Sequence, residues 1–185
     1  LSAAAMETLD GPILLVGCGK MGDALLRGWL EHGVTASDVT VIEPFEQTAS
    51  AARDRGVATL AALDKLPNNF APRVVVFAVK PQVMLDVVPP YRRLVGPNTM
   101  FLSIAAGKAL AFFETHLGAD ATVIRAMPNT PAAIGRGMTV VCANAGASST
   151  DRELAEKLMT AAGAVAWIED EALMDAVTAV SGSGP

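Results

Sequence analysis

The sequence predicts an α/β fold of the Rossmann type, in which a doubly wound and mostly parallel sheet carries helices on both faces. Two features predict it. Short continuous runs of β-forming residues alternate along the chain with segments of helical spacing. The first run leads directly into Gly17-Cys18-Gly19-Lys20-Met21-Gly22 and then into an amphipathic stretch, which is the order strand, glycine turn, helix.

The predicted strands show little polar alternation, as expected when helices cover both faces of a sheet. They are Ile13–Cys18, Val39–Glu43, Val74–Val79, Met100–Ile104, Val123–Met127, Thr139–Ala143 and Ala164–Ile168. Between them, two sets of apolar residues recur at the spacing of one helix face, and a capping-box pattern at Thr150–Glu153 precedes the second. The sets are Met21, Leu25, Leu26, Trp29 and Leu30, and then Leu154, Leu158, Met159 and Ala162.

Length and composition predict a globular chain with one main core. The chain has 185 residues, of which 51% are hydrophobic, and a formal net charge of −5. Its 14 basic residues form no run, so we expect neither a nucleic-acid partner nor a membrane partner. Its two cysteines fit a reducing compartment, so we expect a cytoplasmic protein. We predict a tail at 1–10, a dinucleotide-binding domain at 11–170, and at 171–185 the start of a C-terminal helical domain that is otherwise absent.

Few side chains are available for metal binding or nucleophilic catalysis. The two histidines, His32 and His116, each precede a glycine at the end of a predicted helix, where their simplest role is to oppose the helix C-terminus. Cys18 and Cys142 are far apart and form no Cys-x-x-Cys pair. We therefore expect no metal site, no disulfide framework and no Ser-His-Asp triad.

The three glycines of the first turn predict a dinucleotide site. Gly17 permits the tight turn, Gly19 lets the backbone approach a pyrophosphate, and Gly22 lets the helix close against the sheet. The N-terminus of the helix is then free to hold the anion. The alternative is a glycine-rich turn that binds nothing.

Glu43 closes the second predicted strand, 21 residues after Gly22. An acidic side chain at this place accepts hydrogen bonds from the adenosine ribose of NAD, whereas it repels the 2′-phosphate of NADP. The next basic residues, Arg53 and Arg55, lie a helix away, so the charge favours NADH. The alternative is an exposed glutamate at a strand end.

Three further loops follow predicted strands and so lie at the carboxyl edge of the sheet, where ligands of open α/β folds bind. In Ala78-Val79-Lys80-Pro81 the lysine contacts the cofactor or only precedes a helix that starts at the proline. Ser103-Ile104-Ala105-Ala106-Gly107 has small residues that admit a flat ring or simply pack tightly. Asn129 lies in a proline-stiffened turn, where its amide orients a ligand or supports the turn.

Taken in order, these motifs resemble the pyrroline-5-carboxylate reductases of proline biosynthesis. The resemblance extends from Ile13 to Pro185 and is most specific in Arg125-Ala126-Met127-Pro128-Asn129-Thr130-Pro131 and in the closing Ser181-Gly182-Ser183-Gly184-Pro185. It implies the reduction of L-1-pyrroline-5-carboxylate, a cyclic imino acid, to L-proline by NAD(P)H.

The resemblance also implies roles for individual residues. Those that hold the pyrophosphate are Val16, Gly17, Cys18, Gly19, Lys20 and Met21. Those that line the nicotinamide side are Ala78, Val79, Lys80, Pro81, Ile104, Ala105 and Ala106. Asn129 lies near the reacting ring, and Glu171 and Ser181 lie near the substrate. Catalytic residues are expected beyond Pro185, in a helical domain that makes a homo-oligomer, and residues 1–185 alone are expected to bind cofactor without turnover.

Two other functions remain open at this point. One is a different reductase of the same fold, acting on another imine or on a β-hydroxyacid. The other is a non-catalytic module that binds NAD only to regulate a partner.

Overall fold

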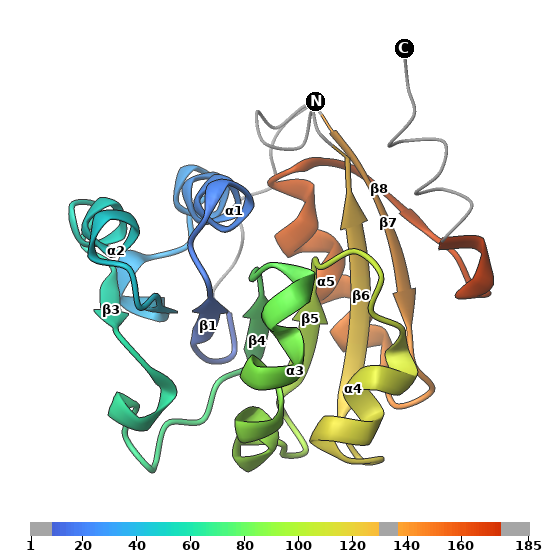
Figure 1. The fold of residues 1–185 in the computed structure, drawn as a ribbon. Coiled ribbons are helices and arrows are strands. Elements are labelled where there is room, and N and C mark those ends of the chain that lie inside the picture. The colour runs from blue at the N-terminus through green and yellow to red at the C-terminus, as the bar shows by residue number, and fades with distance from the viewer. Residues whose placement is uncertain (1–8, 130–136, 175–185) are drawn as a thin grey trace.

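A computed structural model describes residues 9–129 and 137–174, and these residues form one eight-stranded sheet (Figure 1). The strand order is β3-β2-β1-β4-β5-β6-β7-β8, and only the β6–β7 pair is antiparallel. The strands are β1 (Ile13–Val16), β2 (Val39–Ile42), β3 (Ala58–Leu60), β4 (Val74–Phe77), β5 (Met100–Ser103), β6 (Thr122–Pro128), β7 (Gly137–Ala143) and β8 (Gly163–Trp167). The chain turns back between β1 and β4, which is the arrangement of a Rossmann fold.

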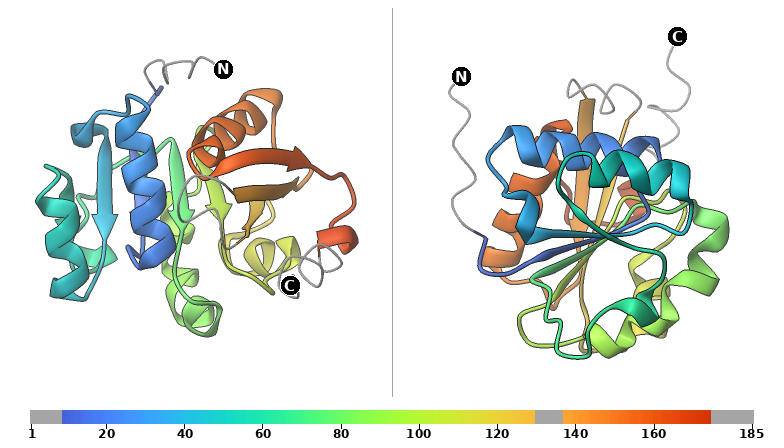
Figure 2. Two further views of the ribbon diagram at one scale, coloured as in Figure 1. Left: turned by 90° about the horizontal axis from the view of Figure 1, so that it is seen from above. Right: turned by 90° about the vertical axis from the view of Figure 1, so that its left-hand side faces the viewer.

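Helices cover both faces of this sheet (Figure 2). The α-helices are α1 (Lys20–Glu31), α2 (Glu46–Arg53), α3 (Met84–Val87), α4 (Leu110–Leu117) and α5 (Ser149–Thr160). Short 3₁₀ turns complete the connections: η1 (Ala36–Asp38), η2 (Leu63–Lys65), η3 (Pro81–Val83) and η4 (Pro89–Leu94).

The core is divided into two layers by the sheet. Ile13 and Leu15 of β1 pack in one cluster with α1, α2 and α5, whereas Leu14 and Val16 pack in the other with α3, η4 and α4. Successive strand residues therefore face opposite layers, and both layers are apolar. This two-sided burial explains why the predicted strands lack polar alternation.

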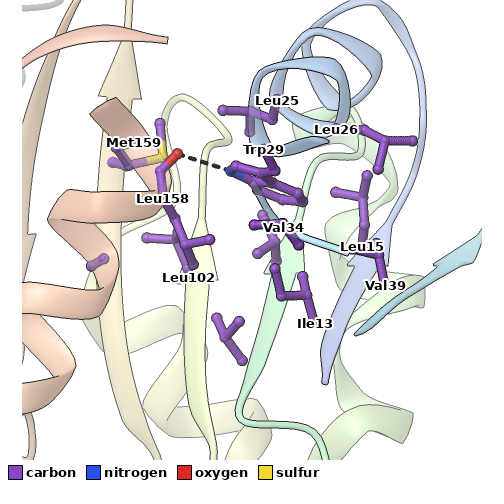
Figure 3. Packing of buried hydrophobic residues seen from close by; sticks show 14 of the residues in the cluster. Ile13, Leu15, Leu25, Leu26, Trp29, Val34, Val39, Leu102, Leu158 and Met159 are labelled. Carbon is purple, nitrogen blue, oxygen red and sulfur yellow. Dashed lines mark hydrogen bonds between the residues drawn. The ribbon is translucent and has the colours of Figure 1, made fainter. Parts of the chain in front are cut away.

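Helices α1 and α5 meet in the first layer although they are far apart in the chain. Trp29 is fully buried, and its indole Nε1 donates a hydrogen bond to the carbonyl oxygen of Leu158 at 2.9 Å (Figure 3). Next to it, a Cβ on Gly28 would lie 2.7 Å from the Cβ of Ala161, so only glycine allows this approach. The contact fixes α1, and with it the glycine turn before α1, to the body of the sheet.

All seven predicted strands are present, with ends shifted by one or two residues. The sequence missed β3, a three-residue edge strand whose side chains are partly exposed and whose pattern is too short to read. The capping box was predicted two residues too late. Ser148 has the extended backbone of an N-cap, and its hydroxyl accepts a hydrogen bond from the N–H of Asp151, whereas Thr150 already belongs to α5.

Both histidines lie at helix ends as predicted. His32 is the C-cap residue of α1, and its Nδ1 lies 2.6 Å from the carbonyl oxygen of Gly28. His116 lies in the last turn of α4, against the ring of Phe112. Within 9–129 and 137–174, no helix is long and apolar enough to cross a membrane, and no cluster of three or more metal-binding side chains occurs. The predicted domain boundary at 170 stays a prediction.

Candidate functional site

The carboxyl ends of four neighbouring parallel strands finish at one level. Val16 is in register with Ile42 of β2 and Phe77 of β4, and Phe77 is in register with Ser103 of β5. The loops that follow these strands therefore leave from the same edge of the sheet. The strand order turns back between β1 and β4, which is the point of an open α/β sheet at which ligands bind.

The turn between β1 and α1 is held by its glycines. Gly17 has φ of +88°, and its N–H donates to the carbonyl oxygen of Ile42 at 2.8 Å. A Cβ on Gly17 would lie 2.7 Å from Cγ1 of Val79, and one on Gly22 would clash with the carbonyl oxygen of Gly17. A Cβ on Gly19, in contrast, would meet no atom within 4 Å. Gly17 and Gly22 therefore shape the turn, while Gly19 leaves space beside it.

The start of α1 presents backbone donors to that space. The first helical hydrogen bond runs from the N–H of Asp23 to the carbonyl oxygen of Gly19, so the N–H groups of Lys20, Met21 and Gly22 have no acceptor within the helix. Lys20 is exposed at the first helical position, where the helix dipole disfavours a positive charge, and it has no ion-pair partner in the described residues. Donor groups beside a cation are the features with which helix N-termini bind anions, and the open space at Gly19 leaves room for a phosphate group.

Glu43 holds the glycine turn to the start of α2. It is only 6% exposed, and its Oε2 accepts a hydrogen bond from the N–H of Cys18 at 2.8 Å. Its Oε1 accepts one from the N–H of Phe45 at 3.0 Å. Glu43 is therefore not the exposed strand-end glutamate that the sequence left open. Each carboxylate oxygen has two lone pairs, so acceptor capacity for ribose hydroxyls remains.

Cys18 is packed into the core behind the turn. Burial, together with the nearby carboxylates of Asp23 and Glu43, raises the pKa of its thiol to about 11. The thiol is protonated at neutral pH and is not a nucleophile. Cys18 contributes its backbone N–H and its bulk to the site.

The loops after β4 and β5 carry the next predicted residues. Ala78 and Val79 are partly buried, and Lys80 is exposed and has no ion-pair partner in the described residues. Pro81 begins η3 directly after it, as predicted. Lys80 is thus a second cation at the edge of the sheet that no described carboxylate neutralises.

The loop after β5 is closed by its own hydrogen bond. The hydroxyl of Ser103 accepts from the N–H of Ala105 at 3.3 Å, Ala105 is buried, and Ile104 and Ala106 are at least partly exposed. Gly107 has φ of +71° and nothing within 4 Å of a Cβ placed on it. Small side chains here leave the backbone open to a ligand.

Asn129 supports the antiparallel pairing of β6 with β7. Its Oδ1 accepts a hydrogen bond from the N–H of Met138 at 2.9 Å, and its own N–H donates to the carbonyl oxygen of Met138. The structural role that the sequence left open is therefore present. Ser181 lies outside the described residues.

Glu171 contacts β6 and α4, and its partner in β6 is Arg125, to which the sequence analysis assigned no function. Its Oε1 accepts from the guanidinium of Arg125 in β6 and, at 2.7 Å, from the N–H of Leu110 at the start of α4. The Arg125 side chain is 4% exposed, and its Nε has no hydrogen-bond partner within the described chain. Arg125 is in register with Ser103, so this buried ion pair lies beside the loop after β5.

Comparison with known proteins gives the family. A family model described as "NADP oxidoreductase coenzyme F420-dependent" matches residues 12–107, more than half of the chain. The chain belongs to this family. The matched segment begins just before β1 and ends at Gly107, so it contains the glycine turn, Glu43 and both loops after β4 and β5.

Individual relatives extend the similarity to nearly the whole chain. A pyrroline-5-carboxylate reductase of Pseudomonas aeruginosa is 39% identical over 178 residues, which are 94% of this chain and 63% of the relative. The solved structure of a pyrroline-5-carboxylate reductase from Coxiella burnetii matches with a TM-score of 0.89 and 28% identity, covering 96% of this chain and 66% of that one. A Plasmodium falciparum pyrroline carboxylate reductase, solved with NADP bound, matches with a TM-score of 0.77 and 25% identity over 95% of this chain and 64% of that one. The chain thus spans slightly less than two thirds of these relatives.

Proposed function

We propose that this protein binds a nicotinamide dinucleotide at the glycine turn and uses it to reduce L-1-pyrroline-5-carboxylate to L-proline. The observation that carries the proposal is the turn itself. Three N–H groups without intrahelical acceptors and an exposed lysine surround the open space at Gly19. The substrate is proposed from the pyrroline-5-carboxylate reductases that match 94% or more of this chain.

The residues of the turn fit the dinucleotide in specific ways. The N–H groups of Lys20, Met21 and Gly22 donate to the pyrophosphate, and the Lys20 ammonium adds a positive charge. The fixed small-residue loop Ile104–Ala106 lines the nicotinamide end, and Asn129 lies beyond it. The cofactor, when bound, supplies a hydride to the imine carbon.

The protein's own contribution to such a reaction is positioning. An imine is readily protonated to an electrophilic iminium, so the chain has to hold the two reactants together and needs no covalent nucleophile. This agrees with the protonated, buried thiol of Cys18. Glu171 is proposed to lie near the substrate, with one oxygen tied to Arg125 and Leu110.

We further propose that NADH is preferred over NADPH. Glu43 places a carboxylate where the adenosine ribose belongs, and a 2′-phosphate there would meet a like charge. The nearest cations along the chain are already engaged: Arg53 with Glu46 and Thr59, and Arg55 with Asp23 at 2.6 Å. Lys20 and Lys80, which have no ion-pair partner among the described residues, belong to the pyrophosphate and nicotinamide part of the proposed site.

The cofactor preference is tested by titrating the 185-residue chain with NADH and with NADPH in separate calorimetric experiments. We expect NADH to bind at least about tenfold more tightly. Glu43→Gln removes the charge, and we expect it to narrow the ratio of the two dissociation constants. The ratio of the dissociation constants is the proper readout, because loosening of the turn by this substitution would lower the affinity for both cofactors by the same factor. Equal binding of NADH and NADPH by the unaltered chain would disprove the preference.

The activity is tested by following oxidation of the reduced cofactor in the presence of pyrroline-5-carboxylate and by detecting proline as the product. Two proteins are assayed: the 185-residue chain, and the same chain fused to the part of the Pseudomonas aeruginosa relative that it does not match. Proline formation by either protein supports the proposal. A fusion that binds NADH but turns over only β-hydroxyacids or other imines would contradict it.

A further inference from the structure

We infer that Phe45 provides the stacking face for the adenine base of the bound dinucleotide. The inference rests on the proposed function, because it needs a dinucleotide at the glycine turn. It extends that function by assigning the adenine end of the ligand to a named side chain of this chain.

Phe45 is unusual among the large apolar side chains. It is 72% exposed, which is the highest value among the exposed large hydrophobic residues of the described chain. Phenylalanine is among the residues most often buried, and single exposed apolar residues occur on many surfaces. The exposure of Phe45 therefore carries meaning only through its position.

The position is directly beside the ribose acceptor. Phe45 follows Glu43 by two residues, and its N–H donates to Oε1 of Glu43 at 3.0 Å. The other oxygen of the same carboxylate accepts from the N–H of Cys18 in the glycine turn. One carboxylate thus ties the phosphate end of the site to the residue that bears the exposed ring. In a dinucleotide, the adenosine ribose in the same way connects the pyrophosphate to the base.

The backbone of Phe45 is fixed although its ring is exposed. On its carbonyl side the oxygen accepts hydrogen bonds from the N–H of Thr48 at 3.0 Å and of Ala49 at 2.9 Å, so Phe45 is the N-cap of α2. Only the side-chain torsions of Phe45 therefore remain to be ordered when a flat ligand stacks on the ring. Aromatic side chains bind every nucleobase through its π-face.

The surroundings favour a neutral base over a charged group. Glu46, the next residue, is engaged with Arg53, and Glu43 is buried below. A second phosphate in this region would be repelled by the carboxylate of Glu43, which has no cationic partner among the described residues, whereas the adenine ring is uncharged.

The test compares three variants by calorimetry and thermal melting. Phe45→Ala removes the ring, Phe45→Tyr keeps it, and Leu85→Ala removes a similarly exposed side chain, 57% accessible, from α3 on the opposite layer. The ligands are NADH, ADP-ribose, which retains the adenosine and both phosphates, and reduced nicotinamide mononucleotide, which has no adenine.

We expect Phe45→Ala to lower the affinity for NADH and for ADP-ribose about tenfold, within the range measured for base–aromatic stacking. The affinity for reduced nicotinamide mononucleotide and the melting temperature should not change. Phe45→Tyr and Leu85→Ala should bind like the unaltered chain. The inference fails if Phe45→Ala binds NADH normally or loses the mononucleotide by the same factor. If the unaltered chain binds neither NADH nor ADP-ribose, the proposed function fails as well, which separates the two outcomes.

Discussion

The two halves of the sheet's carboxyl edge are built differently. In the half around β1 and β2, one carboxylate, Glu43, binds two backbone N–H groups and no cation. In the half around β5 and β6, the carboxylate of Glu171 binds the guanidinium of Arg125 and the first N–H of α4. The first half is organised by backbone and glycine, and the second by a buried ion pair.

This difference teaches where the site has charge to offer a ligand. The ion pair of the second half is neutralised internally and serves to join β6, α4 and the segment after β8. In the first half the backbone donors of α1 point outward, and Lys20 and Lys80 at the edge are without carboxylate partners among the described residues. We therefore expect an anionic ligand to bind at the half around β1 and β2, which we call the glycine half. In the half around β5 and β6, the charges of Arg125 and Glu171 are already paired with each other.

The largest expected effect sharpens the role of the glycine half. Gly19→Asp should reduce NADH affinity at least about 100-fold, because the new carboxylate enters the space for the pyrophosphate and repels it. The fold should be unaffected, because a Cβ on Gly19 meets no atom within 4 Å. Calorimetric titration with NADH and a urea unfolding curve measure the two quantities.

Gly22→Ala is the matched control for that substitution. Its Cβ would clash with the backbone carbonyl of Gly17, so we expect it to lower the free energy of unfolding by about 1–3 kcal/mol. If both variants lose affinity and stability equally, the division of the turn into a ligand-facing glycine and a structural glycine is wrong.

The second prediction breaks the ion pair of the other half. Arg125→Leu leaves the Glu171 carboxylate, which is 29% exposed, without its cationic partner, and we expect a loss of about 1–3 kcal/mol in the free energy of unfolding. Combining it with Glu171→Leu should restore much of that loss, because no charge is then left unpaired. Urea unfolding of the single and double variants measures the effect.

An exposed pair provides the comparison. Arg152 and Glu169 are also in contact, at 3.1 Å, but their side chains are 34% and 81% exposed. Arg152→Leu should cost at most about 1 kcal/mol, as surface ion pairs do. A similar loss for both arginines would show that burial does not set the strength of the Arg125 pair.

The same comparison explains what could be predicted from sequence. The glycine turn is a local pattern: strand, three glycines and helix lie within about 20 residues of each other, and each step has a physical requirement that restricts the residue type. Glu43 was found by its spacing from the turn. Its second role, binding the N–H groups of Cys18 and Phe45, depends on a side-chain orientation that spacing does not reveal.

The other half could not be predicted in this way. Arg125 meets Glu171 across 46 residues and Leu110 meets it across 61, so only the folded sheet brings them together. The sole signal in the sequence was an arginine within an otherwise apolar strand run, Val123–Met127. A charged residue inside such a run predicts a buried partner, because an unpaired buried charge is strongly unfavourable. Strand β3 could not be predicted either, because its three residues contain no charged residue and are too few to show a strand pattern.

The smallest expected effect tests a long-range ion pair that lies away from the site. Asp151 near the start of α5 accepts hydrogen bonds from Ser148 and from Arg73, the residue before β4, at 2.8 Å. Burial acts to raise the pKa of Asp151, but the Ser148 hydroxyl and N–H and the Arg73 guanidinium outweigh it, so the pKa lies below its ordinary value. A lowered pKa means that the folded state binds this proton less readily than the unfolded state does.

The stabilisation from Asp151 is therefore present at neutral pH and is lost as the pH falls through the lowered pKa. Asp151→Asn should cost about 1–2 kcal/mol at neutral pH, and the difference from the unaltered chain should shrink at acid pH. Ser148→Ala, which removes the cap but leaves the Arg73 pair, should cost about half as much. Neither substitution should change NADH affinity, because both residues lie at the amino edge of the sheet. A change in NADH affinity would mean that charge pairs at the amino edge also influence the proposed site. The difference between the glycine turn with Glu43 and the Arg125–Glu171 pair would then not be enough to explain where the ligand binds.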